Sequence, residues 1–359
     1  MPTRTIAALT LALMMGVTVQ ACAGPTMRSS IITSASDEPN SAVGAKLNSE
    51  IDIIRTTEFR GFLDLTVSPR FIDDSGAATR NIAGFKELSA QRVAPKMIAR
   101  GIADGNVNLI DRGVKGIEYG FAQQNPDGSF RNGMGVAVDD PDALEANTFF
   151  LQAVGHGYLL LAQSEYKGQF LPRLDALKPK INKALEWLLP RKDTLWAKAK
   201  SAPNRLVFDA LAFELNGIVL NNKSYQETGD WFVREYLKSQ RPDGVFVEHG
   251  GHDSSYQAAG MLKVQIYALY CDDLALRDQI NAAVHKGIAW EKTRILDTGE
   301  VSITGNTRTG NRQEKFAGEY KVVSYPEVVE CLLYYAKLNG DSRSEALARK
   351  VTDYARKHR

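Results

Sequence analysis

The fold is decided by a stretch of ten residues, Phe121-Ala122-Gln123-Gln124-Asn125-Pro126-Asp127-Gly128-Ser129-Phe130, which recurs as Leu237-Lys238-Ser239-Gln240-Arg241-Pro242-Asp243-Gly244-Val245-Phe246. Proline stops a helix and glycine accepts positive φ, so each copy predicts a helix end followed by a tight turn. Weaker copies follow Trp187, at 187–190, and Trp290, at 297–301. The copies predict one unit per roughly 50 to 65 residues, longer than the usual two-helix solenoid repeats.

Each unit contains a second helix that is more apolar than the first. These second helices are predicted over 149–161, 208–220, 256–270 and 325–338, with 82–104 as the first of the set and 50–65 as an outer helix. Helices that are apolar nearly all round are buried. The alternation therefore predicts an all-α fold, an (α/α) toroid of helical hairpins in which an inner ring is surrounded by an outer ring. A strand is expected at most over 299–303.

The N-terminus has the pattern of an export signal. Arg4 precedes an apolar run from Ile6 to Val19, and Ala21-Cys22-Ala23 follows. The run is shorter than the ~20 residues that span a membrane, and it predicts a signal peptide over 1–23. Because Cys22 also fits a lipoprotein signal, we expect a periplasmic or secreted protein and favour a lipid-anchored form.

Residues 24–48 are rich in Ser, Asn, Asp and Ala, which predicts a flexible tether. Residues 49–359 are then a single toroid catalytic domain. Its two cysteines, Cys271 and Cys331, lie in apolar helical runs and are expected to be buried free thiols. No Cys and His spacing resembles a zinc site, so we expect no metal and no cofactor.

Polar residues gather just before the apolar helices, where a toroid would bring the helix N-termini together. Asn204, His252 and Lys321 each stand four residues before an aromatic residue of such a helix, and Asn147 and Tyr320 stand near equivalent places. Helix N-termini favour anions. An asparagine at such a place is also a common N-cap, which is the structural alternative for Asn147 and Asn204.

Two loops concentrate reactive side chains. The first, Glu248 to Gln257, holds His249, His252, a pair of glycines that allow close approach of a ligand, and Tyr256. The second, Gly305 to Lys321, is a long polar loop that includes Arg308 and Arg312. Long loops in compact domains are usually functional or disordered, and this one leads directly into an apolar helix.

The Pro-Asp-Gly turns, the segment Gly250-Gly251-His252-Asp253-Ser254-Ser255-Tyr256-Gln257 and the loop Gly305-Asn306-Thr307-Arg308-Thr309-Gly310 resemble those of the (α/α)-toroid polysaccharide lyases. Family 38, which cleaves polyuronates such as glucuronan or alginate, is the most similar. The resemblance covers about residues 80 to 340. Pro-Asp-Gly turns also occur in other helical toroids, so they support the fold more than the function.

The resemblance implies β-elimination, with an Asn or Arg that neutralises the uronate carboxylate, a His or Tyr as base and a Tyr as acid. Neutralisation is needed because removing the C5 proton beside a carboxylate builds a dianion. We assign Asn204 and Arg312 to neutralisation, His252 to the base and Tyr320 to the acid, with the choice between His249 and His252 left open. The remaining candidates bind substrate: Asn147, His249, Tyr256, Arg308 and Lys321.

Two other functions remain open from the sequence. A glycoside hydrolase would need two carboxylates across the mouth, which Asp253 with Glu319 or Asp140 would supply. A periplasmic glycan-binding lipoprotein would use the same aromatic and basic residues without catalysis. In all three cases the expected partner is an anionic polysaccharide or oligosaccharide and not a nucleic acid, and the formal net charge of +2 is a weak bias in that direction.

Overall fold

The computed structural model describes residues 49–133, 135–310, 314–316 and 318–358. These residues form α-helices joined by turns and short 3₁₀ segments, with one small two-stranded hairpin, so the predicted all-α class is confirmed. The signal peptide, Cys22 and the tether predicted over 24–48 lie outside the described residues. Within the described ranges, no helix combines the length and the apolarity needed to cross a membrane.

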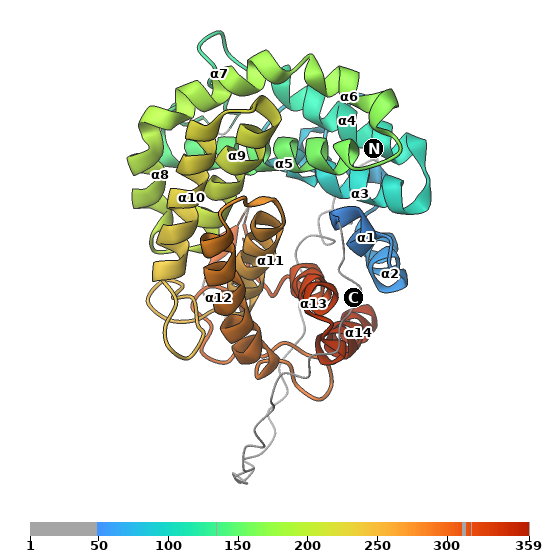
Figure 1. The fold of residues 1–359 in the computed structure, drawn as a ribbon, viewed down its shortest axis with the longest axis vertical. Helices are drawn as coiled ribbons and strands as arrows, with labels where there is room; N and C mark the ends of the chain where they lie inside the picture. Colours follow the sequence, from blue (N-terminus) through green and yellow to red (C-terminus); the bar gives the residue numbers. More distant parts are fainter. Residues whose placement is uncertain (1–48, 134, 311–313, 317, 359) are drawn as a thin grey trace, which may run out of the picture.

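The more apolar helices follow one another in a cyclic order. Helix α3 packs on α5, α5 on α9, α9 on α11 and α11 on α13, and the order is closed because α2 contacts both α13 and α3. Figure 1 shows these helices arranged around a common centre. Their bounds are Ala94–Asp104 for α3, Pro141–Ala162 for α5, Asn204–Leu220 for α9, Ser254–Tyr270 for α11, Tyr325–Asn339 for α13 and Thr57–Thr66 for α2.

A second set of helices lies outside the first. Helix α4 packs on α3, α10 on α9, α12 on α11 and α14 on α13, while α6, α7 and α8 together cover α5 and α9. The bounds are Val107–Phe121 for α4, Lys167–Asp175 for α6, Lys178–Leu188 for α7, Lys192–Ala199 for α8, Lys223–Lys238 for α10, Leu274–Lys292 for α12 and Ser342–Lys357 for α14. The inner helix is the more apolar member in the pairs α9–α10, α11–α12 and α13–α14, as predicted, whereas α3 and α4 are both amphipathic.

The Pro-Asp-Gly turns brace neighbouring hairpins. Gly244 has φ +91°, and a Cβ atom there would lie 2.4 Å from the carbonyl oxygen of Lys286 in α12. Gly128 and Gly299 have the same relation to carbonyls of α7 and α14, and so does Gly76 to α4, a copy that the sequence analysis missed. At the copy that begins at Trp187 the helix ends as predicted, since α7 stops at Leu188, but a 3₁₀ turn over Leu189–Arg191 leads into α8 in place of a tight glycine turn.

Several element boundaries differ from the prediction. The helix expected over 82–104 begins at Ala94, after a 3₁₀ segment over Leu88–Val93, and Pro95 occupies its first turn. The helix expected over 50–65 is divided into α1 (Glu50–Ile54) and α2. The only strands in the described part of the chain are β1 (Lys315–Phe316) and β2 (Glu319–Tyr320), paired antiparallel, whereas Val301 forms only an isolated bridge with Ile295.

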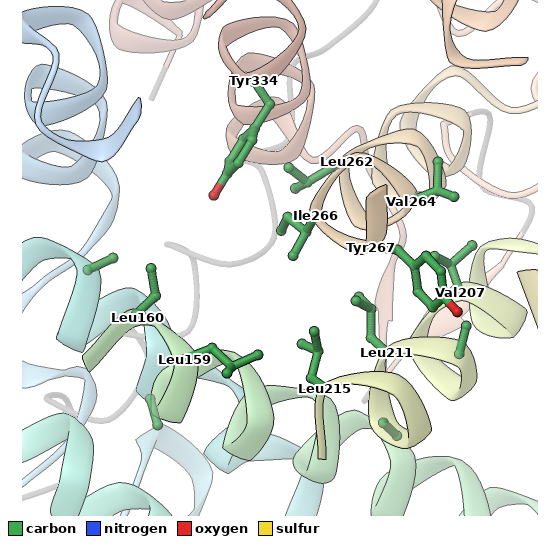
Figure 2. Close-up of a cluster of buried hydrophobic side chains, with 14 of the residues drawn as sticks. Leu159, Leu160, Val207, Leu211, Leu215, Leu262, Val264, Ile266, Tyr267 and Tyr334 are labelled. Atoms are coloured by element: carbon green, nitrogen blue, oxygen red, sulfur yellow. The ribbon is translucent and has the colours of Figure 1, made fainter. Parts of the chain in front are cut away.

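Apolar side chains fill part of the middle of the ring (Figure 2). Leu159, Leu215 and Ile266 extend from α5, α9 and α11 toward its centre (Figure 2), and all three are buried. Burying such side chains is the main stabilising contribution to the fold. Cys271 and Cys331 are buried and free, as predicted.

The buried carboxylate of Glu50 lies at the end of the ring that the C-termini of the inner helices form. It accepts hydrogen bonds from Tyr270 at 2.7 Å and from Tyr334, and lies 2.8 Å from Nε2 of His156. Its three partners come from α11, α13 and α5. Helix α1 therefore ties this end of the ring together, and the opposite end, formed by the helix N-termini, carries the predicted site.

Candidate active site

The N-terminal ends of the inner helices contact one another directly. Arg205 in α9 donates to Glu145 in α5 at 2.9 Å, and the backbone N–H of Ser324, before α13, donates to the hydroxyl of Ser255 in α11 at 2.9 Å. The segments 248–253, 305–310, 314–316 and 318–321 lie against these ends. We call this end of the ring the mouth.

Asp253 fixes the two loops to each other. As the N-cap of α11 it accepts from the backbone N–H groups of Ser255 and Tyr256, and it also accepts from the backbone of Arg308 at 2.9 Å and from the backbone and hydroxyl of Thr309. A buried carboxylate with so many donors has its capacity filled. Asp253 is therefore a structural residue, which weakens its assignment as a hydrolase carboxylate.

Arg308 is the centre of an ion-pair network. Its guanidinium donates to Glu314 at 2.7 and 3.2 Å and to Glu248 at 2.5 Å, and its side chain is 2% exposed. Lys321 donates to the same Glu314 at 2.5 Å. Burial would raise the pKa of Glu314, but the hydrogen bonds from Arg308 and Lys321 outweigh burial and lower it to about 2. The predicted substrate ligand Arg308 is thus occupied by protein carboxylates.

Tyr256 lies between two cations. The guanidinium carbon of Arg308 is 3.9 Å from the centroid of its ring, and the ammonium of Lys321 is 5.4 Å from it. Burial raises the pKa of Tyr256, and Arg308 offsets this only in part. The phenol therefore keeps its proton at neutral pH and is suited to donate it.

His249 lies in the same group of charges. Its backbone N–H donates to the carbonyl of Ser201 at 2.7 Å, and its φ of +48° is unusual for a residue with a side chain. Partial burial, and then the positive charges of Arg308, Arg205 and Lys321, lower the pKa of His249. The imidazole is therefore neutral at pH 7 and, being exposed, is suited to accept a proton from a ligand.

His252 points to a different environment. Its Nε2 lies 3.1 Å from the carbonyl oxygen of Thr304, and its ring packs edge-on against Trp290 of the outer helix α12 at 5.3 Å. The charges of Arg308, Arg205 and Lys321 thus act on the His249 imidazole, whereas the ring of His252 contacts Thr304 and Trp290. This bears on the choice between the two histidines that the sequence left open.

The other predicted residues are placed as follows. Asn204 begins α9 and is buried, and its Oδ1 has no hydrogen-bond partner. Asn147 is buried in the second turn of α5, because that helix begins already at Pro141. Tyr320 is 39% exposed on β2, with the ammonium of Lys315 4.6 Å from its ring. Arg312 lies outside the described residues.

The sequence analysis missed Arg205 and Lys263. Arg205 is close enough to His249, Glu248 and Lys321 to affect their pKa values. Lys263 interrupts the apolar helix α11, and a charged residue in a buried helix was a usable signal for it. We name Asn204, Arg205, Glu248, His249, Tyr256, Arg308, Glu314 and Lys321 the mouth cluster.

A cavity of about 540 Å³ opens at the opposite end of the ring. Amide side chains, Glu50, Tyr270 and Arg277 line it, and no histidine does. The carboxylate in this lining, Glu50, already accepts from Tyr270 and Tyr334 and lies 2.8 Å from Nε2 of His156, so it is tied up in structural contacts. We therefore place the candidate active site at the mouth. No protein-family model matches the chain, and a search of curated proteins found no match.

Proposed function

We propose that the protein is a polysaccharide lyase that cleaves a uronate-containing polysaccharide by β-elimination at the mouth cluster. The observation that carries this proposal is that Arg308, whose guanidinium carbon lies 3.9 Å from the centroid of the Tyr256 ring, is also close enough to His249 for its charge to add to burial in lowering the pKa of that imidazole. A neutral imidazole and a protonated phenol in one site suit a base and an acid respectively. The cyclic helix order supports the (α/α) toroid as the scaffold.

The reaction would begin when the imidazole of His249 removes the C5 proton of a uronate residue. The electrons of the C5–H bond form a C4=C5 double bond as the C4–O4 bond breaks, and the hydroxyl of Tyr256 protonates O4 of the leaving sugar. General base and general acid steps of this kind each accelerate a reaction by ~10² to 10⁴-fold.

The carboxylate next to C5 gains negative charge in this step, so the site needs aimed donors. Arg205 is partly exposed, with one nitrogen on Glu145, and Lys321 lies beside the Tyr256 ring. The amide N–H groups of Asn204 are the remaining candidate donors, since its unpartnered Oδ1 is an acceptor and cannot contact a carboxylate. We assign neutralisation to these three and give Arg308 a positioning role, because Glu248 and Glu314 already occupy its guanidinium.

The hydrolase alternative is less well supported. It relied on Asp253, whose oxygens accept from the helix α11 backbone and from the 308–309 segment. A glycan-binding protein without catalysis would use the same cations and aromatic rings. Export to the periplasm or the cell exterior, with an anchor at Cys22, remains our proposal for the location.

Product analysis distinguishes the three functions. The protein should be incubated with alginate, glucuronan, pectate and glycosaminoglycans and followed by ultraviolet absorbance and by reducing-end release. A lyase produces an unsaturated uronate with new absorbance, a hydrolase produces reducing ends without it, and a binding protein produces neither. Reducing ends without absorbance on all substrates that are cut would overturn the proposal.

A further inference from the structure

A second group of cations and aromatic rings lies deeper in the ring than the mouth cluster. It consists of side chains from a 3₁₀ turn and from five inner helices: Arg92, Lys96, Phe149, Phe208, Lys263 and Glu330. The charges are near one another, since Arg92, Lys96 and Glu330 all affect the pKa of Lys263. We call this group the floor cluster.

Lys263 is the least satisfied member. Its ammonium has one acceptor, Oε1 of Gln152 at 3.4 Å, and lies 5.3 Å from the centroid of the Phe208 ring. An ammonium has three donors. Among the described side chains no carboxylate lies within ion-pair distance of Lys263, whereas Lys96 is paired with Glu330 at 2.7 Å. Lys263 thus has donors to spare for a ligand.

The surroundings of Lys263 disfavour its charge. Burial lowers its pKa to about 8, Glu330 opposes this decrease, and Lys96 and Arg92 add to it. Nevertheless the side chain is only half-buried and remains accessible to solvent inside the ring. An anion that entered there would gain a hydrogen-bonded cation in a region of low dielectric, where such contacts are strong.

Two aromatic rings lie beside this cation. The centroids of Phe149 and Phe208 are 4.6 Å apart, and the guanidinium carbon of Arg92 lies 5.5 Å from the Phe149 ring. Saccharide sites combine apolar aromatic surface with a few polar groups that fix orientation. Phe208 is buried, so a sugar ring would pack against the more exposed Phe149, where Arg92 lies over that ring and Lys263 over the neighbouring Phe208 ring.

The floor cluster is aligned with the mouth cluster. Lys263 follows Tyr256 by seven residues in α11, so both lie on one face of that helix and are separated by about 10 Å along its axis. Glu327 in α13 affects the pKa values of both residues. A short oligosaccharide spans such a distance, so one ligand can reach both clusters.

We propose that Lys263, Phe149 and Phe208 form a carboxylate-binding subsite that holds a second uronate residue of the chain whose bond is broken at the mouth cluster. The subsite rests on the proposed function. It would make the enzyme select polymers in which acidic residues follow one another, because a neutral sugar at that position would leave the cation of Lys263 without a partner.

The test compares Lys263→Met with Lys192→Met by calorimetric titration, both in the Tyr256→Phe background so that the ligand is not consumed. Lys192 is a matched control because its ammonium lies 4.1 Å from the Trp231 ring on the outer helices. The probes are a triglucuronate, a trimannuronate and the neutral cellotriose. We expect Lys263→Met to lose at least ~10-fold in affinity for the better acidic probe and nothing for cellotriose, and Lys192→Met to bind like its parent.

A second readout uses the unmutated side chain, in case Lys263→Met does not fold. Binding of a carboxylate should raise the pKa of Lys263, so titrations near pH 8 in buffers of different ionisation heat should show proton uptake. An amine-reactive acylating reagent should modify Lys263 more slowly when the acidic trisaccharide is present. Equal modification rates with and without the trisaccharide, at concentrations that saturate binding, would overturn the subsite.

The two proposals fail in different ways. If acidic ligands bind in a way that depends on Lys263 but no unsaturated product forms, the subsite is supported and the lyase reaction is refuted. If unsaturated product forms but the acidic ligand binds equally well after Lys263→Met, the reaction is supported and the subsite is refuted.

Discussion

The guanidinium of Arg308 stacks on the ring of Tyr256, with 3.9 Å between its central carbon and the ring centroid. Tyr256 lies in helix α11 and Arg308 in the segment 305–310, and the contact forms because Asp253 accepts from the backbone of Arg308 and caps α11. Glu248 and Glu314 hold the guanidinium in place. A phenol is thus presented at the mouth with its orientation fixed and its proton retained.

Tyr256→Phe should lower turnover by at least ~10²-fold with little change in oligosaccharide affinity, because a proton donor to O4 acts chiefly in the transition state. The ring that stacks on Arg308 is kept. Tyr320→Phe, at the tyrosine we first assigned as the acid, is the matched control and should retain near-normal turnover. Steady-state kinetics of unsaturated product decide the matter, and the reverse ranking of the two variants would return the acid to Tyr320.

His249→Gln should lower turnover by at least ~10²-fold, and His252→Gln should lower it by much less. Because the pKa of His249 is lowered, the neutral base is present at pH 7, and the activity of the wild type should decline only as the pH falls below about 6.5. This decline of activity at low pH, the acidic limb of the pH profile, should be missing from the residual activity of His249→Gln. A limb that persists in that variant but disappears in His252→Gln would contradict the assignment.

Arg308→Met should destabilise the protein by ~3 to 5 kcal/mol, because it leaves the buried carboxylate of Glu248 without its partner. Glu248→Gln in the same chain should recover part of the loss, since it removes the unpaired charge. Arg205→Met, at a more exposed pair with Glu145, should cost less. Urea denaturation measures all three, and equal losses for Arg308→Met and Arg205→Met would show that the network is not held as described.

Asp209→Asn should change how stability depends on pH. Burial raises the pKa of Asp209 from 3.8 to about 8, against smaller opposing effects of Thr148 and Arg205, and neither oxygen has a partner of hydrogen-bond geometry. Between these values the folded state holds a proton that the unfolded state has lost. The free energy of unfolding therefore falls as pH rises, by up to ~1.4 kcal/mol per pH unit from this group.

Denaturation of Asp209→Asn between pH 5 and 8 should show a slope that is less negative than that of the wild type. Asp297→Asn, at a fully exposed side chain, is the control and should leave the slope unchanged. If the wild type, Asp209→Asn and Asp297→Asn all show the same dependence of the free energy of unfolding on pH, the proposed contribution of Asp209 is excluded.

Gly244→Ala should destabilise the protein more than Gly250→Ala. Both glycines have positive φ, +91° and +82°, so both substitutions carry the cost of ~1 kcal/mol or more for a side chain in that region. Only at Gly244 would the new Cβ meet a backbone oxygen, that of Lys286 at 2.4 Å, while nothing lies within 4 Å at Gly250. Thermal melting compares them, and equal losses would mean that the turn does not brace α12.

Much of the fold followed from the sequence alone. The apolar runs at 149–161, 208–220, 256–270 and 325–338 lie within α5, α9, α11 and α13, because a helix buried on nearly every side must be apolar on nearly every side. The Pro-Asp-Gly turns were readable because their chemistry is local. The copy at Gly76 lacks proline and was missed, while Pro190 was over-interpreted because a proline also starts a 3₁₀ turn.

The site depended on the tertiary structure. The sequence supplied His249, His252, Tyr256, Arg308 and Lys321 as candidates, but it left open which histidine faces the cations. Two features favour His249. A tight turn over 248–251 carries it, and the ring of His252 contacts Thr304 and Trp290, which are far from it in the chain. Residue type determines which chemistry a side chain can perform, whereas its charge state and its partners depend on packing against distant segments, which local sequence does not specify.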